Sequence, residues 1–201
     1  MSKNDETLAA YEEHVNEYVA GTPRTANGTV KDWIDRALSF VPVRSTVLEL
    51  GSAFGRDADY MESLGYKVQR TDAAKGFVNL LRGQGKDARV LNAITDDLGG
   101  PHAIVFANAV LLHFERTELQ EVLQKVHAAL APGGVFAFTV KKGEGEEWSS
   151  AKLGAPRHFV YWQAEQLQSY LEAAGFVDCA IEDGSTTNAE WLQVIAHKSA
   201  V

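Results

Sequence analysis

The sequence predicts an α/β fold built on a mostly parallel sheet, and three observations support this. An apolar segment at residues 47–50 runs into a turn bracketed by Gly51 and Gly55, after which the apolar spacing becomes helical. Further short apolar segments alternate with helical patterns along the chain. The last two apolar segments, 177–181 and 191–196, are joined through a glycine-containing turn and predict an antiparallel pair of strands.

Each central element has its own local signal. The helix that follows the glycine turn closes at Gly65. Thr117 forms a capping box with Gln120 at the start of a later helix, which a Pro-Gly-Gly segment ends. A last helix is expected over residues 161–176, with a glycine at its C-terminal cap. Strand patterns are found at residues 66–72, 88–91, 102–107 and 135–140.

The first 40 residues are expected to form helices added to a core of residues 45–201, within a single domain spanning 1–201. A break at 21–23 separates a second helix, over 28–38, from the first. The first helix either packs on the core or also covers a ligand, because ligands of open α/β sheets lie at the carboxyl ends of the strands. Its apolar positions are Leu8, Tyr11, Val15, Tyr18 and Val19.

A long connection, 141–157, follows the fifth strand and is rich in glycine and glutamate. It is either a solvated charged loop or a lid over the ligand, and Trp148 and Tyr161 favour the lid because a plain linker needs no aromatic residues. Arg157 could pair with a substrate carboxylate, or it could be an ordinary surface arginine.

Composition limits the function further. With 201 residues and 45% apolar content, the chain can bury a sizeable core, and no segment is apolar for long enough to span a bilayer. The polar N-terminus predicts no signal peptide, so a cytoplasmic location is expected. A net charge of −8 without a basic cluster disfavours nucleic-acid binding. The six histidines show no metal-ligand spacing, so no metal is expected.

The glycine turn at residues 51–55 differs from a dinucleotide fingerprint, which needs a third glycine, and from a phosphate-binding loop, which needs Gly-Lys-Ser/Thr. Glu49 would repel a diphosphate but suits a positively charged ligand. The pattern E-x-G-x-x-x-G, followed by the strand-terminal Asp72, resembles motifs I and II of the class I S-adenosylmethionine-dependent methyltransferases.

This resemblance extends over nearly the whole chain. Asn92-Ala93, the segment 108–114 and the helix-Pro-Gly-Gly-strand arrangement follow in the family's order. The resemblance implies a three-layer Rossmann-like methyltransferase sheet, mostly parallel with an antiparallel C-terminal strand, and S-adenosyl-L-methionine as the cofactor. It implies that the glycine loop borders the methionine part, that Asp72 binds the ribose and that Asn92 with Ala93 holds the adenine. The residues expected to bind the cofactor are Glu49, Gly51, Ser52, Ala53, Gly55, Asp72, Ala73, Asn92, Ala93, Asn108 and Ala109.

The implied reaction is in-line methyl transfer to a small-molecule acceptor with an oxygen, nitrogen or sulfur nucleophile. A base is needed only for a protonated acceptor, and its candidates are His113, His14 and Tyr18. A lone histidine beside Leu111, Leu112 and Phe114 is more often a packed or helix-capping residue than a catalytic one. The residues expected to contact the acceptor are Tyr11, Tyr18, Trp148, Arg157 and Tyr161.

Other functions are open at this stage. A peptide or protein methyltransferase would be favoured by an open acidic groove near Glu144, Glu146 and Glu147. A non-catalytic S-adenosylmethionine-binding protein could share the fold, because a fold does not determine a function. A nucleotide-dependent oxidoreductase is disfavoured by the missing third glycine.

Overall fold

The computed structural model describes residues 2–186 and 189–201. In this part of the chain, nine strands join in one sheet of order β3-β2-β1-β4-β5-β7-β6, with β9 pairing to β5 and β8 pairing to β9. The strands are β1 (Thr46–Leu50), β2 (Lys67–Asp72), β3 (Ala88–Val90), β4 (His102–Ala107), β5 (Leu130–Lys142), β6 (Glu146–Ser149), β7 (Arg157–Trp162), β8 (Val177–Asp183) and β9 (Trp191–His197). Strands β1 to β5 pair in parallel, whereas β8 and β9 are antiparallel, which confirms the predicted sheet.

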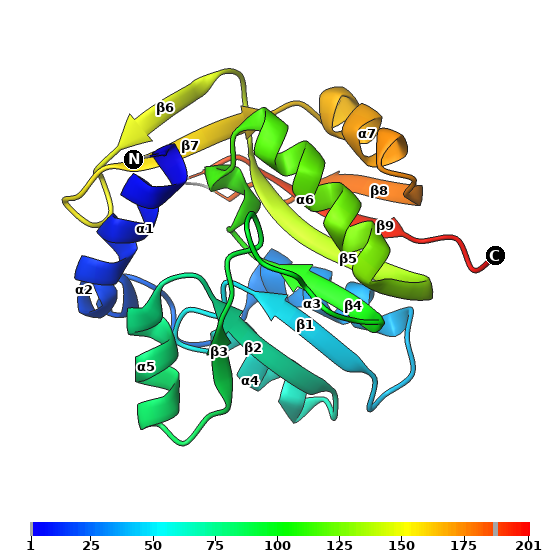
Figure 1. Ribbon diagram of the computed structural model, residues 1–201, viewed down its shortest axis with the longest axis horizontal. Coiled ribbons are helices and arrows are strands. Elements are labelled where there is room, and N and C mark those ends of the chain that lie inside the picture. Colours follow the sequence, from blue (N-terminus) through cyan, green and yellow to red (C-terminus); the bar gives the residue numbers. More distant parts are fainter. Residues whose placement is uncertain (1, 187–188) are drawn as a thin grey trace.

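Helices cover both faces of this sheet and complete the three predicted layers (Figure 1). They are α1 (Lys3–Glu13), α2 (Val15–Ala20), α3 (Gly28–Ser39), α4 (Arg56–Ser63), α5 (Lys75–Gly83), the short 3₁₀ helix η1 (Leu111–His113), α6 (Arg116–Ala129) and α7 (Ala164–Ala173). No helix among the described residues is both long and apolar enough to cross a membrane.

The alternation of side chains along β4 divides the core into two layers. Ile104 and Phe106 pack with Trp33 of α3, whose ring lies 4.9 Å from that of Phe106. Val105 and Ala107 face the opposite side, where the apolar residues of α6 and α7 bury them. Because both faces of β4 are buried, this strand forms a nearly continuous apolar run.

The segment expected to be a long loop forms a hairpin instead. β6 and β7 pair antiparallel, and the end of β7 also pairs in parallel with the tip of β5. The last helix therefore begins at Ala164 and not at residue 161. The aromatic and β-branched residues of 157–162 favour an extended strand once β5 and β6 offer hydrogen-bond partners.

Three further boundaries differ from the predictions. The N-terminal helical pattern breaks at His14, whose φ of −121° and ψ of 35° are not helical, so it forms two helices. The capping box of α6 uses Glu115 and Glu118 in place of Thr117 and Gln120, and the Glu115 amide lies 2.8 Å from the Glu118 carboxylate. β5 begins at Leu130 because that residue pairs with β4 before the Pro-Gly-Gly segment.

Helices α1 and α2 lie beside the carboxyl ends of the parallel strands, between the β6–β7 hairpin and α5 (Figure 1). The Thr7 hydroxyl accepts a hydrogen bond from the backbone amide of His158 at 3.0 Å, which ties α1 to β7. The N-terminal helices thereby form one wall of the space above the strand ends.

Candidate active site

The loop after β1 turns tightly through three residues with positive φ: Gly51 (73°), Ala53 (47°) and Gly55 (88°). A Cβ atom on Gly51 would lie 2.3 Å from a methyl carbon of Val110, and one on Gly55 would lie 2.9 Å from a methyl carbon of Leu81. Both glycines are therefore required by close packing as well as by backbone conformation.

Asp72 at the tip of β2 holds this loop in place. Its carboxylate is 7% exposed and accepts hydrogen bonds from the backbone amides of Ala53 at 2.8 Å and Ala74 at 2.9 Å. Each oxygen accepts one of these bonds and keeps a lone pair for a ligand. Burial raises the pKa of Asp72 to about 6, although the two amides act in the opposite direction.

Glu49 lies beneath the loop and is fully buried. The Ser52 hydroxyl donates a short hydrogen bond to the Glu49 carboxyl group and accepts one from the Thr71 amide at 3.1 Å. Burial, with a further contribution from Asp57, raises the pKa of Glu49 to about 8. Neither Glu49 nor Gly55 is among the described residues that line the two cavities presented next.

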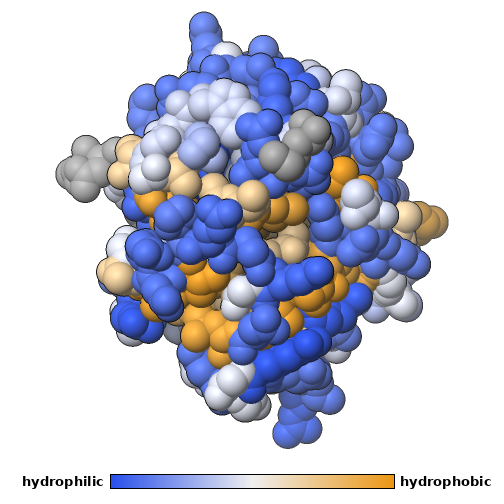
Figure 2. Space-filling model, turned by 60° about the vertical axis from the view of Figure 1, so that its left-hand side comes forward, coloured by the Kyte–Doolittle hydropathy of each residue, from blue (hydrophilic) through white to orange (hydrophobic). Residues whose placement is uncertain are grey.

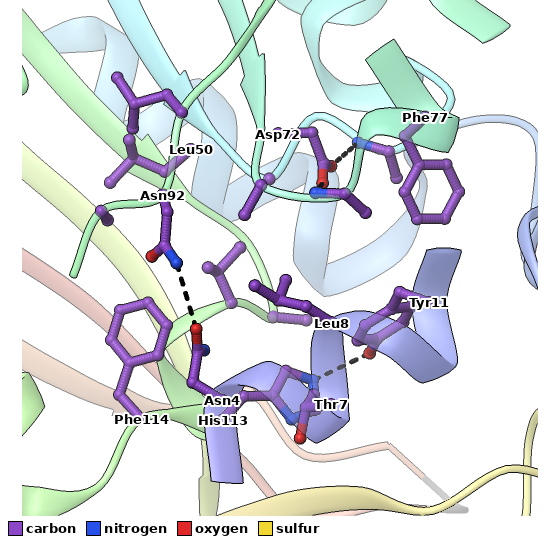
Figure 3. Close-up of a pocket in the computed structure, with 18 of the residues that line it drawn as sticks. Asn4, Thr7, Leu8, Tyr11, Leu50, Asp72, Phe77, Asn92, His113 and Phe114 are labelled. Carbon is purple, nitrogen blue, oxygen red and sulfur yellow. Dashed lines mark hydrogen bonds between the residues drawn. The ribbon is translucent and has the colours of Figure 1, made fainter. Parts of the chain in front are cut away.

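The first cavity, of about 680 Å³ including its open side, lies between α1 and the ends of β1, β2 and β4. Asn4 and Leu8 of α1 point across it toward the strand ends that carry Asp72 and Asn92 (Figure 3). Eight of the predicted cofactor residues line it: Gly51, Ala53, Asp72, Ala73, Asn92, Ala93, Asn108 and Ala109.

Several lining residues were not predicted from the sequence. Asn4 is 6% exposed, and its side-chain oxygen accepts a hydrogen bond from the Asn92 amide group at 3.2 Å. The other additional residues are Thr7, Leu8, Leu50, Ala74, Phe77, Leu91, Val110 and Phe114. For the residues of α1, the sequence signal was the spacing of Asn4, Thr7, Leu8 and Tyr11, which places them on one face of a helix.

Asn108 connects the ends of β4 and β5 to the start of α4. Its amide group donates to Asp57 at 2.8 Å, and its oxygen accepts from the Thr139 hydroxyl at 2.9 Å. The Thr139 oxygen in turn accepts from the Ala109 amide at 2.8 Å. Asp57 also pairs with Arg56 at 2.7 Å, so its charge is neutralised. This network holds the floor shared by both cavities.

The second cavity is wider, about 2210 Å³ including its open side. Its walls come from the α2–α3 connection, the β6–β7 hairpin, β5 and β9. Seen from the side of α1 and α2, apolar residues gather across the middle of the face, framed by hydrophilic ones (Figure 2). The two cavities meet at Tyr11, Tyr18, Gly51, Ala53, Asn108, Ala109 and His113.

A buried Tyr11–His113 pair stands at this junction. His113 Nδ1 lies 2.6 Å from the His158 carbonyl oxygen, which can only accept, so Nδ1 carries the proton. Nε2 is then the acceptor, and the Tyr11 hydroxyl donates to it at 2.8 Å. Arg157 donates to the Tyr11 oxygen at 3.2 Å. Burial lowers the pKa of His113 to about 3 and raises that of Tyr11.

Among the described residues, three predicted positions besides Glu49 and Gly55 are absent from the lining of both cavities: His14, Trp148 and Tyr161. His14 lies at the junction of α1 and α2, 3.9 Å from Glu17. Trp148 is 41% exposed on the hairpin, and the Tyr161 hydroxyl donates to Glu147 at 2.5 Å. Ser52 and Arg157 line the second cavity, with Arg56, Lys141 and Lys152, which were not predicted there.

Comparison with known proteins identifies the family to which the chain belongs. Residues 15–180 match the sequence model of a family described as a methyltransferase domain. No protein of curated function matches the chain.

Solved structures share the fold at low sequence identity. The 1,6-didemethyltoxoflavin-N1-methyltransferase of Burkholderia thailandensis, with bound 1,6-didemethyltoxoflavin and S-adenosylhomocysteine, has a TM-score of 0.71 and 19% identity, covering 98% of this chain and 87% of its own. Phosphoethanolamine N-methyltransferase 2 of Haemonchus contortus, in complex with S-adenosyl-L-methionine, has a TM-score of 0.74 and 15% identity, covering 99% of this chain but 60% of its own. A glycopeptide N-methyltransferase has a TM-score of 0.68 and 16% identity, covering 86% and 91%.

Proposed function

The chain belongs to the methyltransferase domain family and is an S-adenosylmethionine-dependent methyltransferase, and we propose that it methylates an oxygen, nitrogen or sulfur nucleophile of a small molecule. The main support for this proposal is that the two cavities meet at Ala53, Ala109 and Tyr11. Two ligands bound in separate cavities can meet there, as direct transfer between them requires.

The first cavity fits S-adenosylmethionine by the chemistry of its lining. Asp72 keeps a free lone pair on each carboxylate oxygen, which suits the two ribose hydroxyl groups. Asn92 offers a side-chain amide, and Leu91 and Phe114 offer apolar contacts to a flat base. Ser52 and Glu49 would set the loop that borders the methionine part, with Glu49 acting through its hydrogen bond to Ser52.

When bound, S-adenosylmethionine supplies a methyl group already activated by its sulfonium. The chain then has to align the acceptor and keep water away. The N-terminal segment 1–40 is proposed to be the cover, because α1 and α2 contribute Asn4, Thr7, Leu8, Tyr11 and Tyr18 to the lining. Tyr18 packs edge-on against Tyr11 at 5.6 Å, which closes the wall between the helices and the junction.

A proton released by the acceptor would leave through Tyr11. His113 cannot receive it directly, because Tyr11 already occupies Nε2. The acceptor proton would pass to the Tyr11 oxygen as the Tyr11 proton passes to His113 Nε2. The low pKa of His113 makes this route unfavourable before methyl transfer, so we assign His113 chiefly to positioning Tyr11.

The peptide alternative has less support. The glutamates that would form an acidic groove are engaged elsewhere, since Glu146 pairs with Lys3 at 2.8 Å and Glu147 accepts from Tyr161. In the described part of the chain, Glu144, Glu146 and Glu147 stand outside the lining of both cavities. The acidic side chains therefore do not offer a recognition surface beside the reacting groups.

Calorimetric titration with S-adenosylmethionine and S-adenosylhomocysteine, with NAD as the negative control, tests the cofactor site. We expect micromolar binding of both adenosyl ligands and a loss of roughly tenfold or more in Asp72→Asn, which removes the charge that accepts the ribose hydroxyls. Asp87→Asn is the matched control, because Asp87 is exposed and stands outside both linings.

Release of S-adenosylhomocysteine in the presence of a panel of amines, phenols, thiols and carboxylic acids then tests the acceptor class. Turnover of a small acceptor would support the proposal. Turnover of peptides or proteins supplied in parallel, without turnover of any small acceptor, would refute it even if the cofactor binds as expected.

A further inference from the structure

The second cavity is basic, although the chain as a whole carries a net charge of −8. Its described lining includes four cationic side chains, Arg56, Lys141, Lys152 and Arg157, and a single carboxylate, Asp57. Arg56 and Asp57 pair through two nitrogen–oxygen contacts of 2.7 and 3.1 Å, so they neutralise each other. Three positive charges remain to be explained.

Arg157 is the most unusual of these three. Its side chain is only 5% exposed, yet none of the ion pairs among the described residues includes it. One guanidinium nitrogen donates to Tyr11, whereas the buried Nε has no hydrogen-bond partner. Isolating a buried charge and leaving a buried donor unpaired are both unfavourable. A ligand that accepts hydrogen bonds and carries negative charge would remove both costs.

Arg157 is also held rigidly. It begins β7, where its backbone pairs with Ser149 of β6. Its guanidinium group lies 5.1 Å from the ring centre of Phe159 and 5.5 Å from that of Tyr11. A planar, pre-positioned guanidinium group suits two parallel hydrogen bonds to a carboxylate or phosphate.

The two lysines extend the positive surface. Lys152 Nζ lies 2.7 Å from the Thr22 hydroxyl and 4.0 Å from the ring centre of Tyr18. Partial burial lowers the pKa of Lys152 to about 8, and repulsion from Arg157 and then Arg56 adds to this effect. Lys141 Nζ lies 4.6 Å from the ring centre of Phe159, and none of the ion pairs among the described residues includes Lys141.

We propose that the acceptor is an anion whose carboxylate or phosphate group binds between Arg157 and Lys152. Aromatic side chains of Tyr18 and Phe159 would hold the rest of the molecule, and its nucleophile would face the junction at Ala109. This inference rests on the proposed function, because it requires the second cavity to be the acceptor site.

The test uses protein saturated with S-adenosylhomocysteine in a phosphate-free buffer of low ionic strength. This complex is titrated calorimetrically with inorganic phosphate, with benzoate and with the neutral analogue benzamide. We expect saturable binding of at least one anion in the millimolar range and none of benzamide, because each probe supplies only part of the acceptor. The two anions also distinguish a phosphate preference from a carboxylate preference.

Two variants locate the bound anion. Arg157→Gln and Lys152→Gln should each weaken anion binding by roughly tenfold or more while S-adenosylhomocysteine binding is kept. Lys152 is on the surface, so its variant remains informative if the buried Arg157→Gln protein folds poorly. Lys67→Gln is the matched control, since Lys67 is an exposed lysine at the start of β2, the opposite end of the strand from Asp72.

Each other result overturns the inference. Equal binding of benzamide and benzoate would show that charge is not recognised, and absence of saturable anion binding would exclude the site. Binding that occurs only without S-adenosylhomocysteine would assign the cations to the carboxylate of the cofactor itself. A protein that does not bind S-adenosylhomocysteine at all would instead refute the proposed function, which this design separates from the other outcomes.

Discussion

The hydroxyl of Tyr11 lies 2.8 Å from Nε2 of His113 and joins α1 to the short helix η1 after β4. Since His113 Nδ1 is committed to a carbonyl oxygen, Tyr11 is the donor in this bond. The buried imidazole is thus neutral and fully paired. The contact also sets the position of the Tyr11 oxygen at the junction of the two cavities.

We predict that Tyr11→Phe will lower the free energy of unfolding by about 1–3 kcal/mol, because it leaves His113 Nε2 buried without a donor. Urea denaturation measures this change. Tyr170→Phe is the matched control, since no hydrogen bond of the Tyr170 hydroxyl occurs within the described residues, where its ring packs on Trp162. Equal stability of the two variants would contradict the importance of the Tyr11–His113 bond.

The affinity for S-adenosylhomocysteine should depend on pH through Asp72. Its pKa of about 6 means that the carboxylate is ionised above this pH and protonated below it. Protonation replaces an acceptor site with a donor, so the dissociation constant should rise as the pH falls through about 6. Calorimetry at several pH values measures the effect, and Asp72→Asn should abolish the step. A step of the same size in the variant would assign the titration to another group.

Glu49→Gln should alter the pH dependence of stability. The pKa of Glu49 is about 8 in the folded chain against an ordinary value of 4.5, so the folded state retains a proton that the unfolded state loses. The free energy of unfolding contributed by this group therefore falls as the pH rises from 4.5 to about 8. The uncharged Gln side chain removes this fall while keeping an oxygen to accept from Ser52. Denaturation curves of the unmutated protein and of Glu49→Gln at pH 5 and pH 8 measure this difference. Equal losses of stability in the two proteins between pH 5 and pH 8 would refute the prediction.

Gly51→Ala should destabilise the protein by about 2–4 kcal/mol, through both backbone strain and the close approach to Val110. Gly85→Ala is the matched control, because Gly85 has a similar φ of 75° but no atom near an added Cβ. It should cost only about 1 kcal/mol. The double variant Gly51→Ala/Val110→Ala should recover most of the stability by which Gly51→Ala falls below Gly85→Ala. Thermal denaturation measures this recovery. If Gly51→Ala lowers the free energy of unfolding by no more than Gly85→Ala does, the loop after β1 moves freely away from Val110.

Local patterns were sufficient for much of the fold. The apolar segment before Gly51, the acid at the tip of β2 and the run of 102–107 each matched an observed strand or turn. The C-terminal pair was likewise recognised from two apolar segments and the turn between them. These features depend on backbone conformation and on side-chain periodicity, which are properties of neighbouring residues.

The β6–β7 hairpin could not be predicted in the same way. Residues 157–160 follow a glycine-rich segment, and residues 161–162 border a helical pattern, so local spacing alone favoured a loop followed by a longer helix. Pairing with β5 and β6 decides the strand, because an extended segment is stable only when partners satisfy its amides. That pairing also buries Arg157, whose surroundings no local pattern describes.

The sequence by itself determined the glycine loop and the place of Asp72 at the end of a strand, because tight turns and strand ends are encoded by adjacent residues. Only the tertiary structure decided that Tyr11 meets His113, 102 residues away, and that Arg157 reaches the same point without an acidic partner. Contacts of this kind depend on how helices and strands pack, and the same local periodicity is compatible with many packings.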